Sequence, residues 1–171
     1  MRFGVLSDTH GRLDPKVFKA FAGVDRILHA GDIGSEAVLE ALQRIAPVTA
    51  IRGNNDLGTS LERLRDVEVI EIDRRTVLMI HDVKEIFKPT EKIGRSLREA
   101  DPDIILSGHS HKGVIEEKEG VIYFNPGGAG PKRFSLKRSI GLMEWDEKRV
   151  RLKLIFLEGG EPISRAFSLN R

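Results

Sequence analysis

Two histidines separated by one residue, in the segment Gly108-His109-Ser110-His111, are the residues of this chain whose types and spacing best suit chemistry. They follow the apolar run Ile104-Ile105-Leu106, which predicts a short buried strand ending in a tight loop. Residues i and i+2 of an extended segment project to the same side, so the two imidazoles can converge on one centre or on two neighbouring centres. A His-x-His pair also occurs in solvated or hydrogen-bonded loops. Its meaning therefore depends on which other polar residues the fold brings close to it.

Other apolar runs of the chain end in the same manner, in a histidine, an aspartate or an asparagine. The residues at these ends are Asp8 with His10, Asp32, Asn54 and His81. Open α/β sheets keep their sites at the carboxyl ends of strands, so we expect these ends to meet. Imidazole, carboxylate and amide oxygen are the ligands that borderline divalent metals accept in proteins. The sequence therefore predicts a metal centre assembled from several strand ends.

Composition limits the class of protein. The 171 residues, 40% of them hydrophobic, predict one domain over residues 1–171 that is large enough to bury a core. The absence of cysteine excludes disulfides and thiolate ligands. The 28 basic and 26 acidic residues are interspersed, which argues against a dedicated nucleic-acid surface. No apolar run reaches the roughly 18 residues of a membrane span and no signal peptide is evident, so we expect a cytoplasmic protein without membrane association.

Strands and helices alternate in the first half of the chain. Strands are predicted at residues 3–7, 26–30 and 48–51. The first helix is predicted to begin at Asp14-Pro15 and to bury Val17, Phe18, Phe21 and Ala22, and the second to be capped by Ser35. This alternation indicates parallel strands with right-handed crossovers.

Hairpins dominate the second half. They are predicted at residues 67–72 with 76–80, 113–117 with 121–124, and 139–145 with 149–157, followed by a strand at 163–169. A helix capped by Thr90 separates the first hairpin from the strand that precedes the paired histidines. Early βαβ units followed by hairpins predict an α/β fold of two mixed sheets packed face to face, with helices outside.

The order of the polar segments named above along the chain is similar to that in a known family. Together they resemble the motifs of the calcineurin-like metallophosphoesterases, in particular the small single-domain branch that includes YfcE and Vps29: Asp8-Thr9-His10, Gly31-Asp32, Gly53-Asn54-Asn55-Asp56, His81 and Gly108-His109-Ser110-His111. The resemblance extends from residue 2 to about residue 135, because the loop that begins at Asn125-Pro126-Gly127 is similar as well. It implies a four-layer αββα sandwich with a binuclear metal site at the carboxyl ends of the strands.

The resemblance also implies a ligand set. The first metal would be held by Asp8, His10, Asp32 and His111, and the second by Asn54, His81 and His109, with Asp32 bridging. A metal-bridging hydroxide would then attack a phosphate ester, as two-metal sites allow. Manganese is the first candidate for both ions, and nickel, iron, cobalt and zinc also suit these ligands.

Asn55 stands where many members of the wider superfamily carry a histidine that protonates the leaving oxygen. An amide can donate a hydrogen bond but cannot give up a proton at neutral pH. We assign catalytic roles to Asp32, Asn55 and Asp56, and substrate binding to Asn54, Asn55 and Arg12. Asp82 replaces a usual glycine, and it either orients a ligand or is a surface carboxylate.

Several residues have a structural interpretation beside the functional one. His29 lies within a predicted strand, where a core imidazole is the favoured interpretation. The basic residues Lys132, Arg133, Lys137 and Arg138 either receive a phosphate or form a solvated face.

Two functions remain open. The favoured one is a phosphoesterase, above all a phosphodiesterase, for a small phosphate ester such as a nucleotide. The alternative is a non-catalytic, Vps29-like scaffold that binds metal and protein partners. The complete ligand set favours the enzyme, and a homo-oligomer is compatible with either function.

Overall fold

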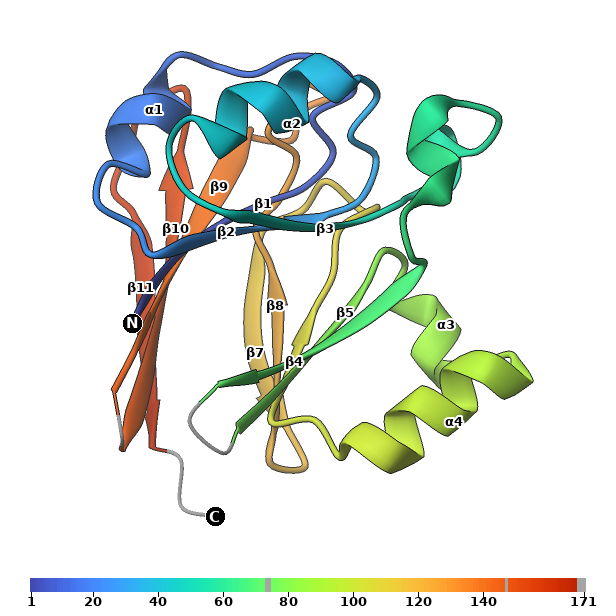
Figure 1. Cartoon of the computed structure of the whole chain (residues 1–171). Coiled ribbons are helices and arrows are strands. Elements are labelled where there is room, and N and C mark those ends of the chain that lie inside the picture. Colours follow the sequence, from blue (N-terminus) through green and yellow to red (C-terminus); the bar gives the residue numbers. More distant parts are fainter. Residues whose placement is uncertain (73–74, 147, 169–171) are drawn as a thin grey trace.

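Two mixed β-sheets make up the centre of the molecule in the residues that the computed structural model describes, 1–72, 75–146 and 148–168 (Figure 1). The six-stranded sheet has the order β11-β10-β9-β1-β2-β3. Its strands are β1 (Arg2–Leu6), β2 (Arg26–Ala30), β3 (Val48–Ile51), β9 (Ser139–Trp145), β10 (Arg149–Phe156) and β11 (Ile163–Ser168). The five-stranded sheet has the order β4-β5-β6-β8-β7. Its strands are β4 (Val67–Ile72), β5 (Arg75–Ile80), β6 (Ile104–Leu106), β7 (Val114–Lys118) and β8 (Val121–Asn125).

The predicted alternation in the first half is confirmed. Strands β1, β2 and β3 run parallel, joined by α1 (Lys16–Ala20) and α2 (Glu36–Gln43). The carboxylate of Asp14 accepts a hydrogen bond from Lys16 N at 3.0 Å, and the Ser35 hydroxyl accepts one from Ala37 N at 3.2 Å. Both side chains thus satisfy backbone donors that the first helical turn leaves free.

Apolar side chains alternate between the two faces of each strand, and this alternation builds the layers. Phe3 and Val5 point into the core between the sheets, where they join Leu152 and Phe124. The opposite face of the first sheet packs under α1 and α2, where Phe21 is fully buried. The expectation is wrong for Phe18 and Ala22. The Phe18 side chain is 44% exposed on the short helix α1, and Ala22, which follows the end of that helix, is exposed as well.

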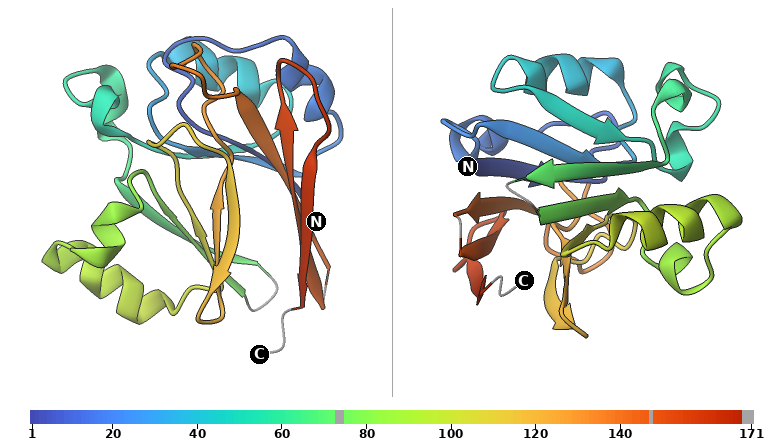
Figure 2. Two further views of the ribbon diagram at one scale, coloured as in Figure 1. Left: turned by 180° about the vertical axis from the view of Figure 1, so that it is seen from behind. Right: turned by 60° about the horizontal axis from the view of Figure 1, so that its bottom comes forward.

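The second sheet has its own outer layer. Helix α4 (Glu91–Ala100) is capped by Thr90 as predicted, and Ile93 packs onto Leu78 and Ile105 of the sheet. Figure 2 shows α1 and α2 on one side of the paired sheets and α3 (Lys84–Phe87) with α4 on the other. The fold is the four-layer αββα sandwich that the sequence predicts.

Differences from the predicted elements are small. Most predicted strand ends agree within one residue, and the last predicted strand includes residue 169, which lies outside the described residues. Helix α3 and the 3-10 helices η1 (Asn54–Asp56) and η2 (Ser60–Arg63) were not predicted, because segments of three or four residues are too short to show helical periodicity. Among the described residues, no helix is long and apolar enough to cross a membrane.

Candidate metal centre

Strand ends from both sheets meet at one edge of the sandwich. Asp8 follows β1 and His81 follows β5, and each backbone is tied to a neighbouring strand end. Asp8 N donates to the carbonyl oxygen of Gly31 at 3.0 Å, and Gly108 N donates to that of His81 at 2.9 Å. The loops that carry the predicted ligands are therefore held together by backbone hydrogen bonds before any side chain contributes.

Glycines allow these loops to approach one another. A Cβ atom on Gly53 would lie 2.1 Å from Asp32 Oδ1, and one on Gly108 would lie 1.9 Å from Ser7 Oγ. Real Cβ atoms do not approach so closely, so any side chain at either position would displace the strand end beside it. The glycines that precede Asn54 and His109 are thus required by close packing of the loops.

The first cluster of side chains contains Asp8, His10 and His111, whose ligand atoms lie within 4.8 Å of one another. His111 Nε2 lies 3.4 Å from Asp8 Oδ1 and 3.3 Å from His10 Nε2. The two imidazole rings are stacked, with an interplanar angle of 6°. Two nitrogens and one carboxylate oxygen therefore converge on one point, as predicted.

The second cluster forms around His81. Its Nδ1 lies 2.7 Å from the carbonyl oxygen of Ala30, which fixes the ring and leaves Nε2 facing Asp32 Oδ2 at 3.4 Å. Nearby, His109 Nδ1 lies 3.0 Å from Asn54 Oδ1. A backbone acceptor on one ring nitrogen is a common way to direct the other nitrogen of a histidine toward a metal.

Asp32 lies between the two clusters. Its Oδ2 atom is 3.4 Å from His81 Nε2 and 3.9 Å from His10 Nε2. Its two oxygens also accept hydrogen bonds from Asn55, from the backbone N–H at 2.8 Å and from the side-chain amide at 2.6 Å. Asp32 is thus placed where a bridging ligand would have to be.

Two buried atoms provide a test of whether these residues fit a metal. Asp8 Oδ1 and His81 Nε2 are inaccessible to solvent and have no hydrogen-bond partner among the described residues. Leaving such groups unpaired is costly, and each can offer a lone pair to a cation. The residues therefore fit divalent ions, which Asp8, His10, Asp32 and His111 would hold on one side and Asn54, His81, His109 and Asp32 on the other.

The electrostatics differ between the two clusters: burial lowers the pKa of His10 and of His111, whereas Asp32 and the Ala30 carbonyl raise the pKa of His81 although burial opposes them. Burial lowers the pKa of His111 to about 4, with Arg133 and His10 adding to the effect. Burial raises the pKa of Asp8 to about 6. Burial would also raise the pKa of Asp32, but the His81 imidazole and the Asn55 N–H groups outweigh it and hold that pKa below its usual range.

The backbone at the centre is unusual. Five of the predicted ligand residues have the left-handed conformation that non-glycine residues rarely adopt, with φ angles between 46° and 64°: Asp8, His10, Asp32, His109 and His111. Such conformations cost on the order of 1–3 kcal/mol each and cluster at functional sites. The strain is a further sign that these loops are shaped for their side chains to converge.

The prediction of a catalytic Asp56 needs correction. Its carboxylate is fully buried and accepts backbone hydrogen bonds from Ile33 at 3.1 Å, Gly34 at 2.9 Å and Gly53 at 2.9 Å. These donors belong to the loops after β2 and β3. Asp56 is therefore a positioning residue that fastens the Asp32 loop to the Asn54 loop.

The predicted substrate contact Arg12 is also not brought into the centre. A cavity of about 370 Å³ opens over the metal ligands, and its lining does not include Arg12: Asp32, Asn54, Asn55, His109, Ser110, His111, Arg133, Phe134 and Leu136. Arg133 approaches the ligands instead, with Nη2 3.4 Å from His10 Nε2. In the sequence, Arg133 stood out only as one of several basic residues between positions 132 and 138. Arg138 of that run has a structural role, because it pairs with Asp14 and Glu158.

Asp82 lies beside a predicted ligand. Its Oδ2 atom is 3.7 Å from His109 Nε2, and its Oδ1 atom accepts a hydrogen bond from Lys84 N at 2.9 Å. The carboxylate therefore faces the nitrogen of His109 that points away from Asn54. Of its two predicted roles, the structure favours the orienting one.

His29 is a core residue, as the sequence favoured. The Thr9 hydroxyl donates to the carbonyl oxygen of Ile33 at 2.9 Å, so the His29 Nε2–H group must donate to Thr9 Oγ1, also at 2.9 Å. Its Nδ1 atom then carries a buried lone pair without a hydrogen-bond partner among the described residues. Burial accordingly lowers the pKa of His29 to about 3.

This imidazole should make the stability of the metal-free protein depend on pH. Its pKa is depressed in the folded state, so its stabilising contribution is complete above the unfolded pKa of 6.5 and is lost as the pH falls toward 3. Over that interval we expect about 1.4 kcal/mol of unfolding free energy to be lost per pH unit. Urea unfolding in EDTA at several pH values measures the slope, and His29→Phe should remove this part of it. Equal slopes for both proteins would contradict the interpretation.

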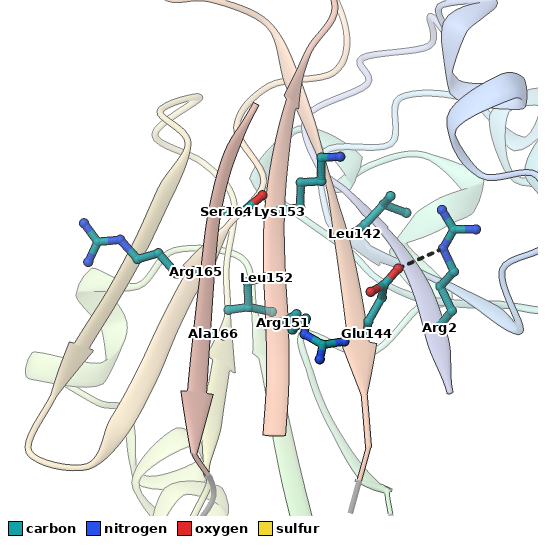
Figure 3. Close-up of a pocket in the computed structure, with 9 residues that line it drawn as sticks. All are labelled: Arg2, Leu142, Glu144, Arg151, Leu152, Lys153, Ser164, Arg165 and Ala166. Atoms are coloured by element: carbon teal, nitrogen blue, oxygen red, sulfur yellow. Dashed lines mark ion pairs between the residues drawn. The ribbon is translucent and has the colours of Figure 1, made fainter. Parts of the chain in front are cut away.

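A different cavity, of about 410 Å³, lies on the strands β9, β10 and β11 (Figure 3). Arg2 and Glu144 form an ion pair across it at 3.6 Å, while the guanidinium of Arg165 points away from this pair. Arg151 and Lys153 also line it, but none of the predicted metal ligands does. The functional centre is therefore assigned to the cavity over the imidazoles.

Comparison with known proteins agrees with this geometry. The model of the calcineurin-like phosphoesterase superfamily domain matches residues 1–148, and the chain belongs to this superfamily. A protein named probable metallophosphoesterase, from Methanothermobacter thermautotrophicus, is 31% identical over 176 residues that cover 100% of both chains. Phosphodiesterase MJ0936 from Methanocaldococcus jannaschii is 26% identical over 168 residues, which cover 88% of this chain and 97% of the relative.

Solved structures show the same fold. Vps29 from Entamoeba histolytica, in complex with Zn²⁺, superimposes with a TM-score of 0.76 at 22% identity, covering 98% of this chain and 99% of the other. The phosphoesterase YfcE from E. coli has a TM-score of 0.72 at 21% identity, covering 99% of this chain and 100% of the other. The resemblance to the branch that contains YfcE and Vps29 is confirmed.

Proposed function

We propose that this chain is a phosphodiesterase that depends on two divalent metal ions, with manganese as the first candidate. The observation that carries the proposal is that Asp8 Oδ1 and His81 Nε2 are buried without a hydrogen-bond partner among the described residues, while ligand atoms of Asp8, Asp32 and His81 lie within 4.8 Å of one another. The relative named phosphodiesterase MJ0936 supports the choice of a diester. The substrate is a small phosphate ester, with nucleotides among the candidates.

Bound metals would supply a hydroxide nucleophile derived from water and positive charge for the phosphoryl oxygens. The residues of the chain contribute the remaining interactions of the centre. Asp32 ties the two clusters together, and imidazole ligands, unlike carboxylates, would leave the charge of bound ions uncompensated, so that the centre would attract an anion. The Arg133 guanidinium lies at the edge of the cavity, where it adds to the attraction.

Asn55 determines which leaving groups are accessible. Its amide already donates to Asp32 Oδ2 at 2.6 Å, and an amide cannot give up a proton at neutral pH. We therefore expect a steep dependence of rate on the basicity of the leaving group, with p-nitrophenyl diesters far ahead of alkyl diesters. Asn55→His should raise turnover of alkyl diesters by about 10²-fold if it restores a general acid. A shallow dependence in the wild type would show that another residue is the acid.

Hydrolysis of bis(p-nitrophenyl) phosphate tests the proposed function. The protein is reconstituted with Mn²⁺, Zn²⁺ or Ni²⁺, freed of excess metal, and measured for metal content and for release of p-nitrophenolate. We expect two ions per chain, as a two-metal site requires, and turnover that EDTA abolishes. His81→Ala should lose mainly one ion, because its Nε2 serves one of the two clusters.

The scaffold alternative makes the opposite prediction. A Vps29-like protein without catalytic function would bind its metals and leave every ester intact. Full metal occupancy without turnover on monoesters and diesters would therefore support the alternative and overturn the enzyme.

A further inference from the structure

One wall of the cavity over the metal ligands does not come from a strand end. It is formed by the loop between β8 and β9, which contributes Arg133, Phe134 and Leu136. This loop crosses the same edge of the sandwich where the ligands converge, as its contact with His10 shows. Two consecutive residues of the loop have properties that the fold itself does not explain.

Phe134 is the first of them. Its side chain is 93% exposed, and its backbone has a φ of 51°, a conformation that bulky residues adopt only under constraint. The residue thus combines an apolar ring in water with a strained backbone. Two other exposed phenylalanines, Phe18 and Phe87, lack the strained backbone and do not line this cavity. Strain of this kind is typical of residues that are held in place for a ligand.

Arg133 is the second. Its Nη2 atom lies 3.4 Å from His10 Nε2, and no carboxylate of the described residues lies within ion-pair distance of its guanidinium. Arg138, five residues later, has two such partners. The Arg133 guanidinium faces an imidazole, and no described carboxylate neutralises its positive charge. An anion bound there would supply the missing counter-ion. The planar set of donors of the guanidinium matches the oxygens of a phosphate group.

We propose that Arg133 and Phe134 form a recognition rim for phosphate esters that carry an aromatic group. Arg133 binds a non-bridging phosphate oxygen, and the ring of Phe134 stacks on the aromatic group of the ester. The inference rests on the proposed function and specifies its substrate class. The aromatic group can be a simple aryl ring or a nucleobase, because both present a flat face to the phenylalanine.

Calorimetric titration tests the rim without requiring turnover. The Mn²⁺-loaded protein is titrated with inorganic phosphate, phenyl phosphate and adenosine 5′-monophosphate. Phe134→Ala should weaken binding of the two aromatic ligands by about tenfold and leave inorganic phosphate within about twofold. Arg133→Gln should weaken all three, because every one of them has the phosphate.

Phe18→Ala is the matched control, since it removes an exposed phenylalanine on α1 and should change none of the three affinities. The two aromatic ligands separate the possible sources: a larger loss for the nucleotide than for phenyl phosphate identifies a nucleobase site. An unchanged preference for aromatic ligands in Phe134→Ala overturns the proposal, as does a wild type that binds neither phosphate nor its esters. If the protein prefers aromatic ligands but hydrolyses no diester, the recognition rim is supported and the proposed phosphodiesterase function is refuted.

Discussion

Asparagine in place of Asp32 is expected to lower hydrolysis of an aryl phosphodiester by about 10³-fold, in the range found when one electrostatic group of a catalytic centre is removed. The carboxylate faces both clusters, at 3.4 Å from His81 Nε2 and 3.9 Å from His10 Nε2. An amide would remove its negative charge. It would also turn an NH₂ group toward one of the two donors of Asn55 that the carboxylate now satisfies. Both effects would act on the two proposed metal sites at once.

Metal content distinguishes this effect from a loss of folding. Asp32→Asn should retain the circular dichroism of the wild type and bind both ions more weakly, as equilibrium dialysis with Mn²⁺ would show. Asp82→Asn is the matched comparison: the same chemical change beside His109, expected to reduce metal affinity by about tenfold at one site only. Loss of a single ion in Asp32→Asn would contradict its placement between the two clusters.

Alanine in place of Asp56 is expected to cost about 3 kcal/mol or more of unfolding free energy. Three N–H groups would lose their acceptor, and the two of them that are buried would each cost roughly 1–3 kcal/mol before any relaxation of the loops. The bonds come from Ile33, Gly34 and Gly53, and the carboxylate is fully buried. Urea unfolding of the metal-free protein at pH 7 measures the loss.

Asp146→Ala is the control for this prediction. The Asp146 carboxylate also accepts two backbone hydrogen bonds, from Lys148 and Arg149 at 2.9 Å, but it is exposed at a hairpin turn. Water can replace it there, so the loss should be about 1 kcal/mol, similar to that of an exposed cap. Equal losses in the two variants would mean that burial of the Asp56 carboxylate and of its Ile33 and Gly53 donors is unimportant.

Much of the fold is predictable because its strands appear in the sequence as short local runs of apolar residues. Runs such as Ile104–Leu106 are short, aliphatic and followed by Ser107-Gly108, and this combination of length and turn residues favours a buried strand. The predicted ligands follow from the same patterns, since polar residues at the carboxyl ends of strands are carried to one edge of the sheets. The motif order then identifies the family.

The errors concern residues whose roles depend on a contact far away in the sequence. Asp56 looks like a catalytic carboxylate in the sequence, and only the structure shows its hydrogen bonds to Ile33 and Gly34. Arg12 follows a ligand motif directly, whereas Arg133 reaches His10 across 123 residues. Sequence proximity favoured the wrong arginine, because nothing local indicates where the loop between β8 and β9 returns.

The left-handed backbone conformation of five predicted ligands affects which substitutions would be favoured when the chain is selected for stability. At Asp8, His10, Asp32, His109 and His111, glycine would adopt the observed backbone without the strain that these side chains impose. A laboratory search that rewards only heat resistance could therefore relieve backbone strain at the positions proposed to hold metal, and each such change would remove a proposed ligand. Relief of backbone strain and the proposed metal binding are opposed at these five positions, so an engineer who wants a sturdier protein should keep them fixed and vary the outer layers of the sandwich.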